Sequence, residues 1–149
     1  MEPHILGKYI SILHRHKQRY VNQRMRDDGL GYAGYNFLIY VLKHEGCSQK
    51  DMCRDLAIDE AQATRKINRM VQEGYLSRVK EGRGYSLRVD RRGREVLPRL
   101  YQTLDEWWNA VLEGMPERDV EELAACLARM AERARRQSEG EEDNGHGEQ

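Results

Sequence analysis

The feature that most constrains this fold is one pair of strand-like runs in a chain whose other apolar residues follow helical spacing. The runs, "YLSRVK" at 75–80 and "YSLRVD" at 85–90, flank the turn-forming stretch "EGRG". Their residue types predict a β-hairpin with its tip at Gly82, Arg83 and Gly84. A single hairpin among helices predicts the mainly α class with a small β element.

The segment that leads into the hairpin, "AQATRKINRMVQEGYLSR" at 61–78, has the pattern of an amphipathic helix. Asp59 and Gln62, three residues apart, form a helix-capping pair at its start. On a helical wheel the apolar and polar residues separate onto two sides. The apolar side holds Ala63, Ile67, Met70 and Val71, and the opposite side holds Gln62, Arg65, Lys66, Arg69 and Glu73.

Five further helices are predicted from the same periodicity and from capping residues. Ser48, followed by Asp51, caps the third helix of the chain. Pro98 lies inside the fifth, where we expect a kink, the alternative being a helix that begins later than Asp90. The predicted segments are Ile5 to about Tyr20, residues 35–46, residues 48–56, residues 90–111 and a sixth helix after Pro116.

This order of elements, helices and a hairpin between flanking helices, is that of a winged helix-turn-helix inside a helical dimerisation frame. We assign residues 1–28 and 95–136 to the dimerisation region and residues 29–94 to the DNA-binding region. Charge agrees with this assignment. From Arg54 to Arg94 the chain has eleven Lys or Arg against six Asp or Glu, the excess expected of a surface that meets a polyanion.

The net charge of zero conceals an acidic end. Residues 137–149 hold five acidic residues, no Lys or Arg, and no apolar residue. The rest of the chain therefore carries 25 cationic against 20 acidic side chains. Because this tail cannot bury apolar surface, we expect it to be disordered.

The stretch "GLGYAGYNFLIYVLKHEGCSQKDMCRDLAIDEAQATRKINRMVQEGYLSR" resembles the MarR family of bacterial and archaeal transcription regulators. The matching pieces are the family's "GLT-x-x-Q" entry to the second helix, "S-Q-K-x-L", the "T-R" of the recognition helix and the "G-Y/L-L/I-x-R" exit. "VDRRG" stands where the family usually has "LT-x-x-G", and the resemblance spans roughly residues 5–135.

The chain departs from the family pattern at two places. Gly31 and Gly34 replace the family's Thr and Gln, and we expect a looser start of the second helix, since an interior glycine costs roughly 1 kcal/mol. The hairpin tip is also shorter than the family's "D-P-x-D-R-R" wing.

The resemblance implies binding to double-stranded DNA. We select Gln62 and Arg65 for base edges, because glutamine pairs with adenine and arginine with guanine through two hydrogen bonds. Lys66 and Arg69 are expected on phosphates, and Arg83 matches the family's minor-groove arginine. An ordinary solvated helix face is the competing interpretation. The predicted DNA-contacting residues are Ser48, Gln62, Arg65, Lys66, Arg69 and Arg83.

The apolar stripes of the first, fifth and sixth helices, together with Trp107 and Trp108, exceed what so small a chain can bury alone. We therefore expect a symmetric homodimer that represses from a pseudo-palindromic operator with half-sites about one helical turn apart. MarR-like proteins often bind small aromatic or phenolic effectors between the frame and the DNA-binding lobe. The candidate lining residues are Tyr9, His16, Tyr35 and Trp107, with plain aromatic packing as an equal alternative.

Other functional classes have weaker patterns. The sequence contains no metalloprotease, phosphate-loop, nucleophile-elbow or paired-cysteine motif, so we expect no enzyme, cofactor or metal. A thiol- or metal-responsive regulator and a winged-helix module for protein contact are the alternatives. Without a signal core or an apolar run of membrane length, we expect a cytoplasmic protein with reduced thiols. Its cysteines are Cys47, Cys53 and Cys126.

Overall fold

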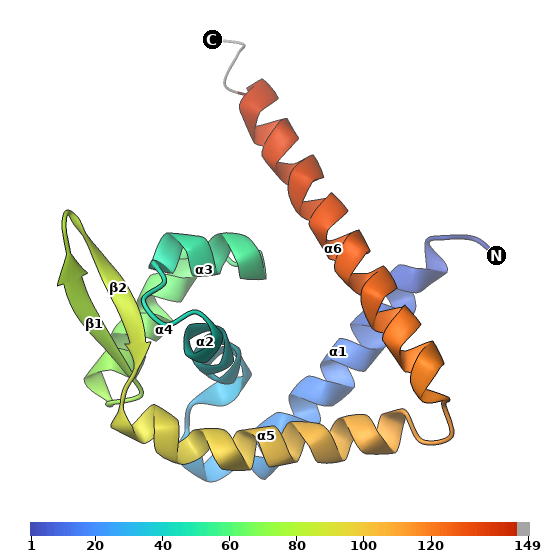
Figure 1. Cartoon of the computed structure of the whole chain (residues 1–149), viewed down its shortest axis with the longest axis horizontal. Coiled ribbons are helices and arrows are strands. Elements are labelled where there is room, and N and C mark those ends of the chain that lie inside the picture. Colours follow the sequence, from blue (N-terminus) through green and yellow to red (C-terminus); the bar gives the residue numbers. More distant parts are fainter. Residues whose placement is uncertain (146–149) are drawn as a thin grey trace. The chain divides into compact units, whose positions relative to one another are not determined.

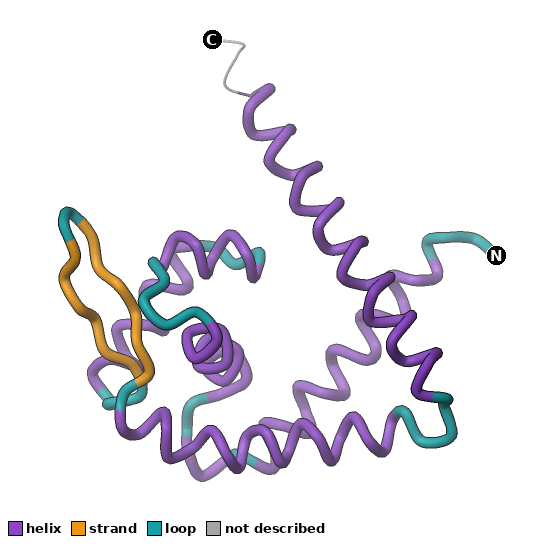
Figure 2. Tube along the Cα trace, viewed as in Figure 1, coloured by secondary structure: helices purple, strands orange, loops and turns teal. Residues whose placement is uncertain are grey.

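A computed structural model describes residues 1–145, apart from the side chain of Asn144. One antiparallel hairpin follows the first group of helices and precedes the last two (Figure 1), and Figure 2 shows the strand pair between helical segments. This arrangement confirms the predicted mainly α class with a hairpin wing. The elements are α1 (Ile5–Arg24), η1 (Arg26–Asp28), α2 (Gly31–Lys43), α3 (Gln49–Leu56), α4 (Glu60–Gln72), β1 (Leu76–Glu81), β2 (Gly84–Val89), α5 (Arg91–Val111) and α6 (Glu117–Gly145).

The chain divides into two compact units, residues 1–109 and residues 110–149. The first unit holds α1 to α4, the hairpin and most of α5. The second holds the end of α5 and, among the described residues, all of α6. Every residue predicted to contact DNA lies in the first unit.

Helix α2 is the centre of the first unit, where it contacts α1, α3, α4 and β2. Phe37, Leu38 and Val41 are buried, and tyrosines on other sides of the helix are buried as well. A helix that is buried nearly all round forms the core of its domain. The helix begins at Gly31, four residues before the predicted start at Tyr35, because burial of its first turn outweighs the low helix propensity of glycine.

The hairpin is held at its base and exposed at its tip. Its register pairs Leu76 with Val89 at the base and Glu81 with Gly84 at the tip. An isolated bridge between Cys47 and Leu87 attaches β2 to the loop before α3. The base residues are buried in the core and the tip residues are exposed, so the tip projects from a fixed base.

Helix α5 passes close to the base of the hairpin at Gly93. A Cβ there would lie 2.4 Å from the carbonyl oxygen of Tyr75 and 2.9 Å from side-chain atoms of Leu38 and Val89. This close approach explains the glycine of "VDRRG". The helix begins at Arg91, directly after Asp90, and includes Pro98, so the alternative of a later start does not remove the proline from the helix; the kink stays a prediction.

Helix α6 continues to Gly145, into the segment that we expected to be disordered. Arg135 pairs with Glu132 at 2.8 Å and with Glu139 at 2.5 Å, and Arg136 pairs with Glu132 at 2.8 Å. Such pairs three or four residues apart stabilise a helix locally, and the composition of the tail alone leaves out the arginines that precede it. Residues 146–149 of the predicted tail lie outside the described residues.

Candidate nucleic-acid interface

Helices α3 and α4 form the helix-turn-helix, and side-chain caps define where each begins. The Ser48 hydroxyl accepts a hydrogen bond from the Asp51 amide at 3.0 Å. The Asp59 carboxylate accepts one from the Gln62 amide, also at 3.0 Å. Both predicted caps are confirmed. Between the helices, Ala57 adopts the left-handed conformation with φ 54° and terminates α3.

Helix α4 has one buried side and one exposed side, as its sequence predicts. Ala63, Ile67 and Met70 are buried in the core. Gln62, Arg65 and Arg69 are exposed. Arg69 pairs with Glu73 at 3.0 Å, and an ion pair this exposed contributes little to stability. The guanidinium groups of α4 are therefore accessible to a ligand.

Lys66 does not share this exposed side. It is half-buried, and its ammonium group donates a hydrogen bond to the carbonyl oxygen of Leu30, the N-cap residue of α2. Burial, with the charge of Arg69 as a second cause, lowers the pKa of this ammonium group. This position does not support the predicted contact between Lys66 and a phosphate. The helical wheel predicted an exposed side chain, whereas the side chain points toward α2.

Arg83 lies at the tip of the hairpin between Gly82 and Gly84, and all three residues are exposed. The arrangement matches the predicted tip. Because the base of the hairpin is buried and its tip is not, Arg83 is the cationic residue that stands farthest along the hairpin from the core.

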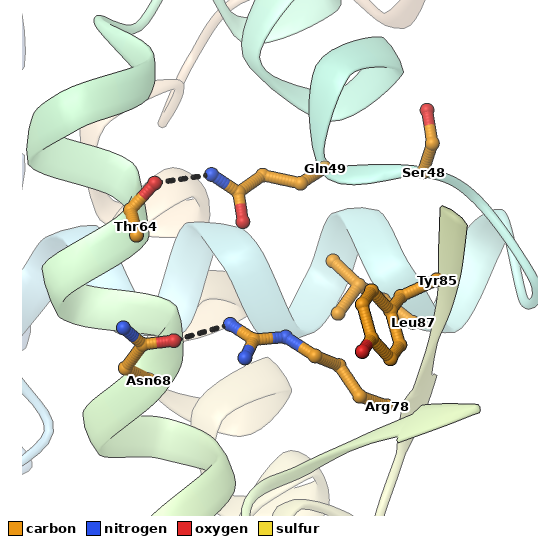
Figure 3. A pocket seen from close by; sticks show the side chains of 7 residues that line it. All are labelled: Ser48, Gln49, Thr64, Asn68, Arg78, Tyr85 and Leu87. Carbon is orange, nitrogen blue, oxygen red and sulfur yellow. Dashed lines mark hydrogen bonds between the residues drawn. The ribbon is translucent and has the colours of Figure 1, made fainter. Parts of the chain in front are cut away.

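A depression of about 330 Å³ lies between the start of α3, helix α4 and the hairpin (Figure 3). On one side the Gln49 amide donates to the Thr64 hydroxyl at 2.7 Å, and on the other the Arg78 guanidinium donates to the Asn68 side-chain oxygen at 2.5 Å. Figure 3 shows both pairs pointing across the gap between elements. The lining residues are Ser48, Gln49, Thr64, Asn68, Arg78, Tyr85 and Leu87.

Sequence reasoning selected one of these lining residues, Ser48. The strand register indicates a second lining residue, Arg78. Arg78 pairs with Leu87, so its side chain lies on the face of the hairpin that packs on the core. Thr64 and Asn68, four residues apart, share one side of α4. A cationic donor beside the start of a helix is an arrangement suited to an anionic group.

The four predicted effector residues differ in their exposure. Tyr35 is buried, and its hydroxyl donates to the carbonyl oxygen of Met25 at 2.8 Å; burial raises the pKa of this hydroxyl to about 12. Trp107 is also buried, whereas Tyr9 and His16 are exposed on α1. For Tyr35 and Trp107, the alternative of aromatic packing describes the positions seen.

The first unit holds a different cluster of aromatic and cationic side chains, formed by His14, Lys17, Tyr32 and Trp108. The Lys17 ammonium is 5.8 Å from the ring centroid of Tyr32 and 5.5 Å from that of Trp108. The His14 and Tyr32 rings meet edge to face with centroids 5.4 Å apart. Three helices, α1, α2 and α5, thus contribute side chains to this cation-aromatic cluster.

The thiol-responsive alternative loses support from the positions of Cys47 and Cys53. Burial raises the pKa of the Cys47 thiol to about 11 and also raises that of the buried Cys53 thiol, and a thiol of raised pKa is poorly reactive. Within residues 1–145, no three His, Cys, Asp or Glu side chains are placed to hold a metal ion. The same residues include no helix that is both long and apolar enough to span a membrane.

Comparison with known proteins gives relatives of one kind. No protein-family model matches the chain. The HTH-type transcriptional regulator BilQ of Clostridioides difficile (strain CD3) is 28% identical over 125 residues, which cover 82% of this chain and 84% of that protein. A MarR transcriptional regulator from Methanosarcina mazei Go1 has a TM-score of 0.81 and 26% identity, covering 90% of this chain and 92% of its own.

Two further solved structures share the fold at lower identity. A MarR family transcriptional regulator from Listeria monocytogenes, complexed with 26mer DNA, has a TM-score of 0.82 at 17% identity over 87% of this chain and 89% of its own. CouR from Rhodococcus jostii RHA1, bound to p-coumaroyl-CoA, has a TM-score of 0.75 at 20% identity over 85% of this chain and 91% of its own. These proteins are regulators and not enzymes, which agrees with the class predicted from the motifs. In sequence and fold the chain is similar to these MarR-type winged helix-turn-helix transcription regulators, the family that its motifs resemble.

Proposed function

We propose that this chain is a dimeric, cytoplasmic repressor that binds a pseudo-palindromic operator in double-stranded DNA and leaves it when a small molecule binds. The observation that carries the proposal is the position of Gln62 and Arg65, exposed at the start of a capped helix beside a basic hairpin. The Listeria protein of the same fold, solved with DNA, supports it.

The contacts follow from these positions. Gln62 and Arg65 read base edges in the major groove, where their two-pronged hydrogen bonds separate adenine from guanine. Arg69 meets the phosphate backbone, and Arg83 reaches toward the minor groove. A phosphate enters the depression beside Ser48, where the start of α3 and Arg78 favour negative charge.

The dimer is supported by apolar side chains that each unit leaves exposed. In a monomer these faces would lie in water, whereas a second copy would cover them without loss of the core. Two copies related by a two-fold axis would present two α4 helices to successive half-sites. The exposed residues are Leu6, Tyr9, Ile10, Ile12 and Leu13 on α1, and Leu123, Leu127 and Met130 on α6.

The effector site is proposed at Lys17, Tyr32 and Trp108 in place of the four residues predicted from the sequence. The cluster offers a cation between two aromatic faces, which suits a small aromatic or phenolic compound with an acidic group. CouR, with its bound p-coumaroyl-CoA, supports an aromatic ligand on this fold. Titration of the DNA complex with 4-hydroxybenzoate should release DNA from the parent and less readily from Trp108→Ala.

The DNA-binding proposal is tested by selecting bound fragments from random duplex and titrating salt. Arg65→Ala should weaken binding to the selected site by about 1 to 3 kcal/mol and relax one base preference. Arg83→Ala should mainly flatten the dependence of affinity on salt. Arg19→Ala, an exposed arginine of α1, is the matched control and should change neither.

Equal binding by the parent and the Arg65→Ala variant would remove α4 from the interface. A parent that enriches no duplex at all would favour the alternative of a winged-helix module for protein contact.

A further inference from the structure

The side chain of Lys66 connects α4, the predicted recognition helix, to the first turn of α2. Its neighbours on α4, Arg65 and Arg69, are exposed, whereas its ammonium group donates a hydrogen bond to the carbonyl oxygen of Leu30. Removing a charged group from water costs free energy unless that group finds a partner. Here the partner belongs to a different helix, so the contact joins two elements of the lobe.

Two glycines of α2 lie against this lysine, and one of them, Gly34, leaves space that it occupies. A Cβ on Gly34 would lie 3.0 Å from Lys66 Cε and 2.6 Å from Leu30 Cγ. A Cβ on Gly31 would lie 3.7 Å from Lys66 Nζ, and Gly31 has φ 74°, a conformation that favours glycine. These are the two positions at which the start of the second helix departs from the MarR pattern, so this departure and the lysine contact occur at the same turn.

The same turn of α2 contacts the helical frame. Tyr32, between the two glycines, meets His14 edge to face and lies under the Lys17 ammonium of α1. Lys17 in turn lies over the ring of Trp108 in α5. A continuous set of contacts therefore runs from α5 and α1 through residues 30–34 to the recognition helix.

We propose that Lys66 is a positioning residue for DNA binding, which holds α4 against the first turn of α2 and does not itself touch DNA. The proposal rests on the DNA-binding function proposed above.

The first test separates positioning from phosphate contact by the salt dependence of binding. Lys66→Met keeps most of the side chain and removes the ammonium group. We expect affinity for the selected duplex to fall about three- to tenfold, with an unchanged slope of log affinity against log salt. Each lost phosphate contact would reduce that slope by about 0.9. Arg69→Met, on the exposed side of the same helix, is the control expected to reduce it.

The second test is a double-mutant cycle. Gly34→Ala places a methyl group against both Leu30 and Lys66, so part of its effect on DNA binding should pass through Lys66. The loss in the double variant should therefore be smaller than the sum of the two single losses. Thermal unfolding of each variant verifies that the lobe is folded, and the same cycle measured on unfolding should also be non-additive.

The outcomes distinguish the two proposals. A Lys66→Met variant that loses salt dependence as Arg69→Met does, or additive losses in the cycle, would overturn the positioning role and leave DNA binding intact. A folded parent that selects no duplex would overturn the proposed function itself.

Discussion

The DNA-binding lobe, residues 29–94, and the long helices α1 and α6 of the frame differ in how far their apolar side chains are buried. In the lobe, Leu38 and Ile67 have no exposed surface. On the frame, Leu13 of α1 and Leu127 of α6 each keep 43% of their surface exposed. The lobe is thus stabilised by contacts within its own chain, whereas the frame presents surface that a second copy would bury.

The two regions also differ in what stabilises their helices. Helices α2 to α4 depend on tertiary burial and on caps at Ser48 and Asp59. Over residues 132–139, helix α6 has ion pairs within its own turns. Changes in the lobe should therefore affect folding, and changes in the frame should affect association.

The largest expected effect is in the centre of the lobe. Leu38→Ala should lower the free energy of unfolding by about 2 to 5 kcal/mol, because it removes buried methyl groups and leaves a cavity. Urea denaturation at a fixed protein concentration measures this. Leu123→Ala on α6 is the matched control, and an equal loss in both variants would contradict the contrast between lobe and frame.

The second effect tests the frame directly. Leu127→Asp should raise the dissociation constant of the dimer about tenfold or more, because a carboxylate would be buried without a partner. Analytical ultracentrifugation over a concentration series measures it, and circular dichroism checks that the chain stays helical. A dimer of unchanged affinity would show that this side of α6 is not the interface.

A smaller effect is expected at the start of the recognition helix. Asp59→Ala should cost about 1 kcal/mol of unfolding free energy, because the Gln62 amide loses its acceptor. Asp59→Asn, which keeps a side-chain oxygen, should restore most of it. Thermal unfolding of the two variants side by side decides the point, and an equal loss in both would argue for charge and against the cap.

The smallest effect concerns pH and the bond between α2 and α3. The Tyr40 hydroxyl donates to the Asp55 carboxylate at 2.5 Å and holds the pKa of that carboxyl below its usual 3.8. A lowered pKa in the folded state stabilises the protein above the usual pKa, and this stabilisation is lost as pH falls through the lowered value. The unfolding free energies of the parent and Tyr40→Phe should therefore differ near pH 7 and converge in acid, whereas parallel pH curves would exclude this link.

Much of the lobe was predictable from its sequence because its signals are local. The caps at Ser48 and Asp59 and the tip around Arg83 depend on residues within a few positions of each other. The apolar side of α4 follows from helical periodicity alone. The effector residues were not predictable in this way, since Tyr35 and Trp107 are aromatic in sequence and prove to be buried only when several helices pack.

Lys66 shows most clearly where prediction from the sequence stops. The helical wheel groups it with Arg65 and Arg69, but its side chain points toward α2. The wheel carries no information about the neighbouring helix. The space that its side chain occupies is left by Gly34, more than thirty positions earlier in the chain. The acidic tail gives a second case. Its composition predicted disorder, whereas α6 continues to Gly145 and has ion pairs between Arg135 or Arg136 and the acidic residues around them.

The sequence by itself determined the element order, the two caps, the apolar side of α4 and the resemblance to MarR-type regulators. Each of these depends on interactions between residues close in the chain or on motif order. Tertiary structure alone decided which cation turns inward, which aromatic side chains are buried, and how Arg78 and Asn68 meet across the depression. Those outcomes depend on the volume and hydrogen-bond partners that distant segments provide, which no periodicity encodes.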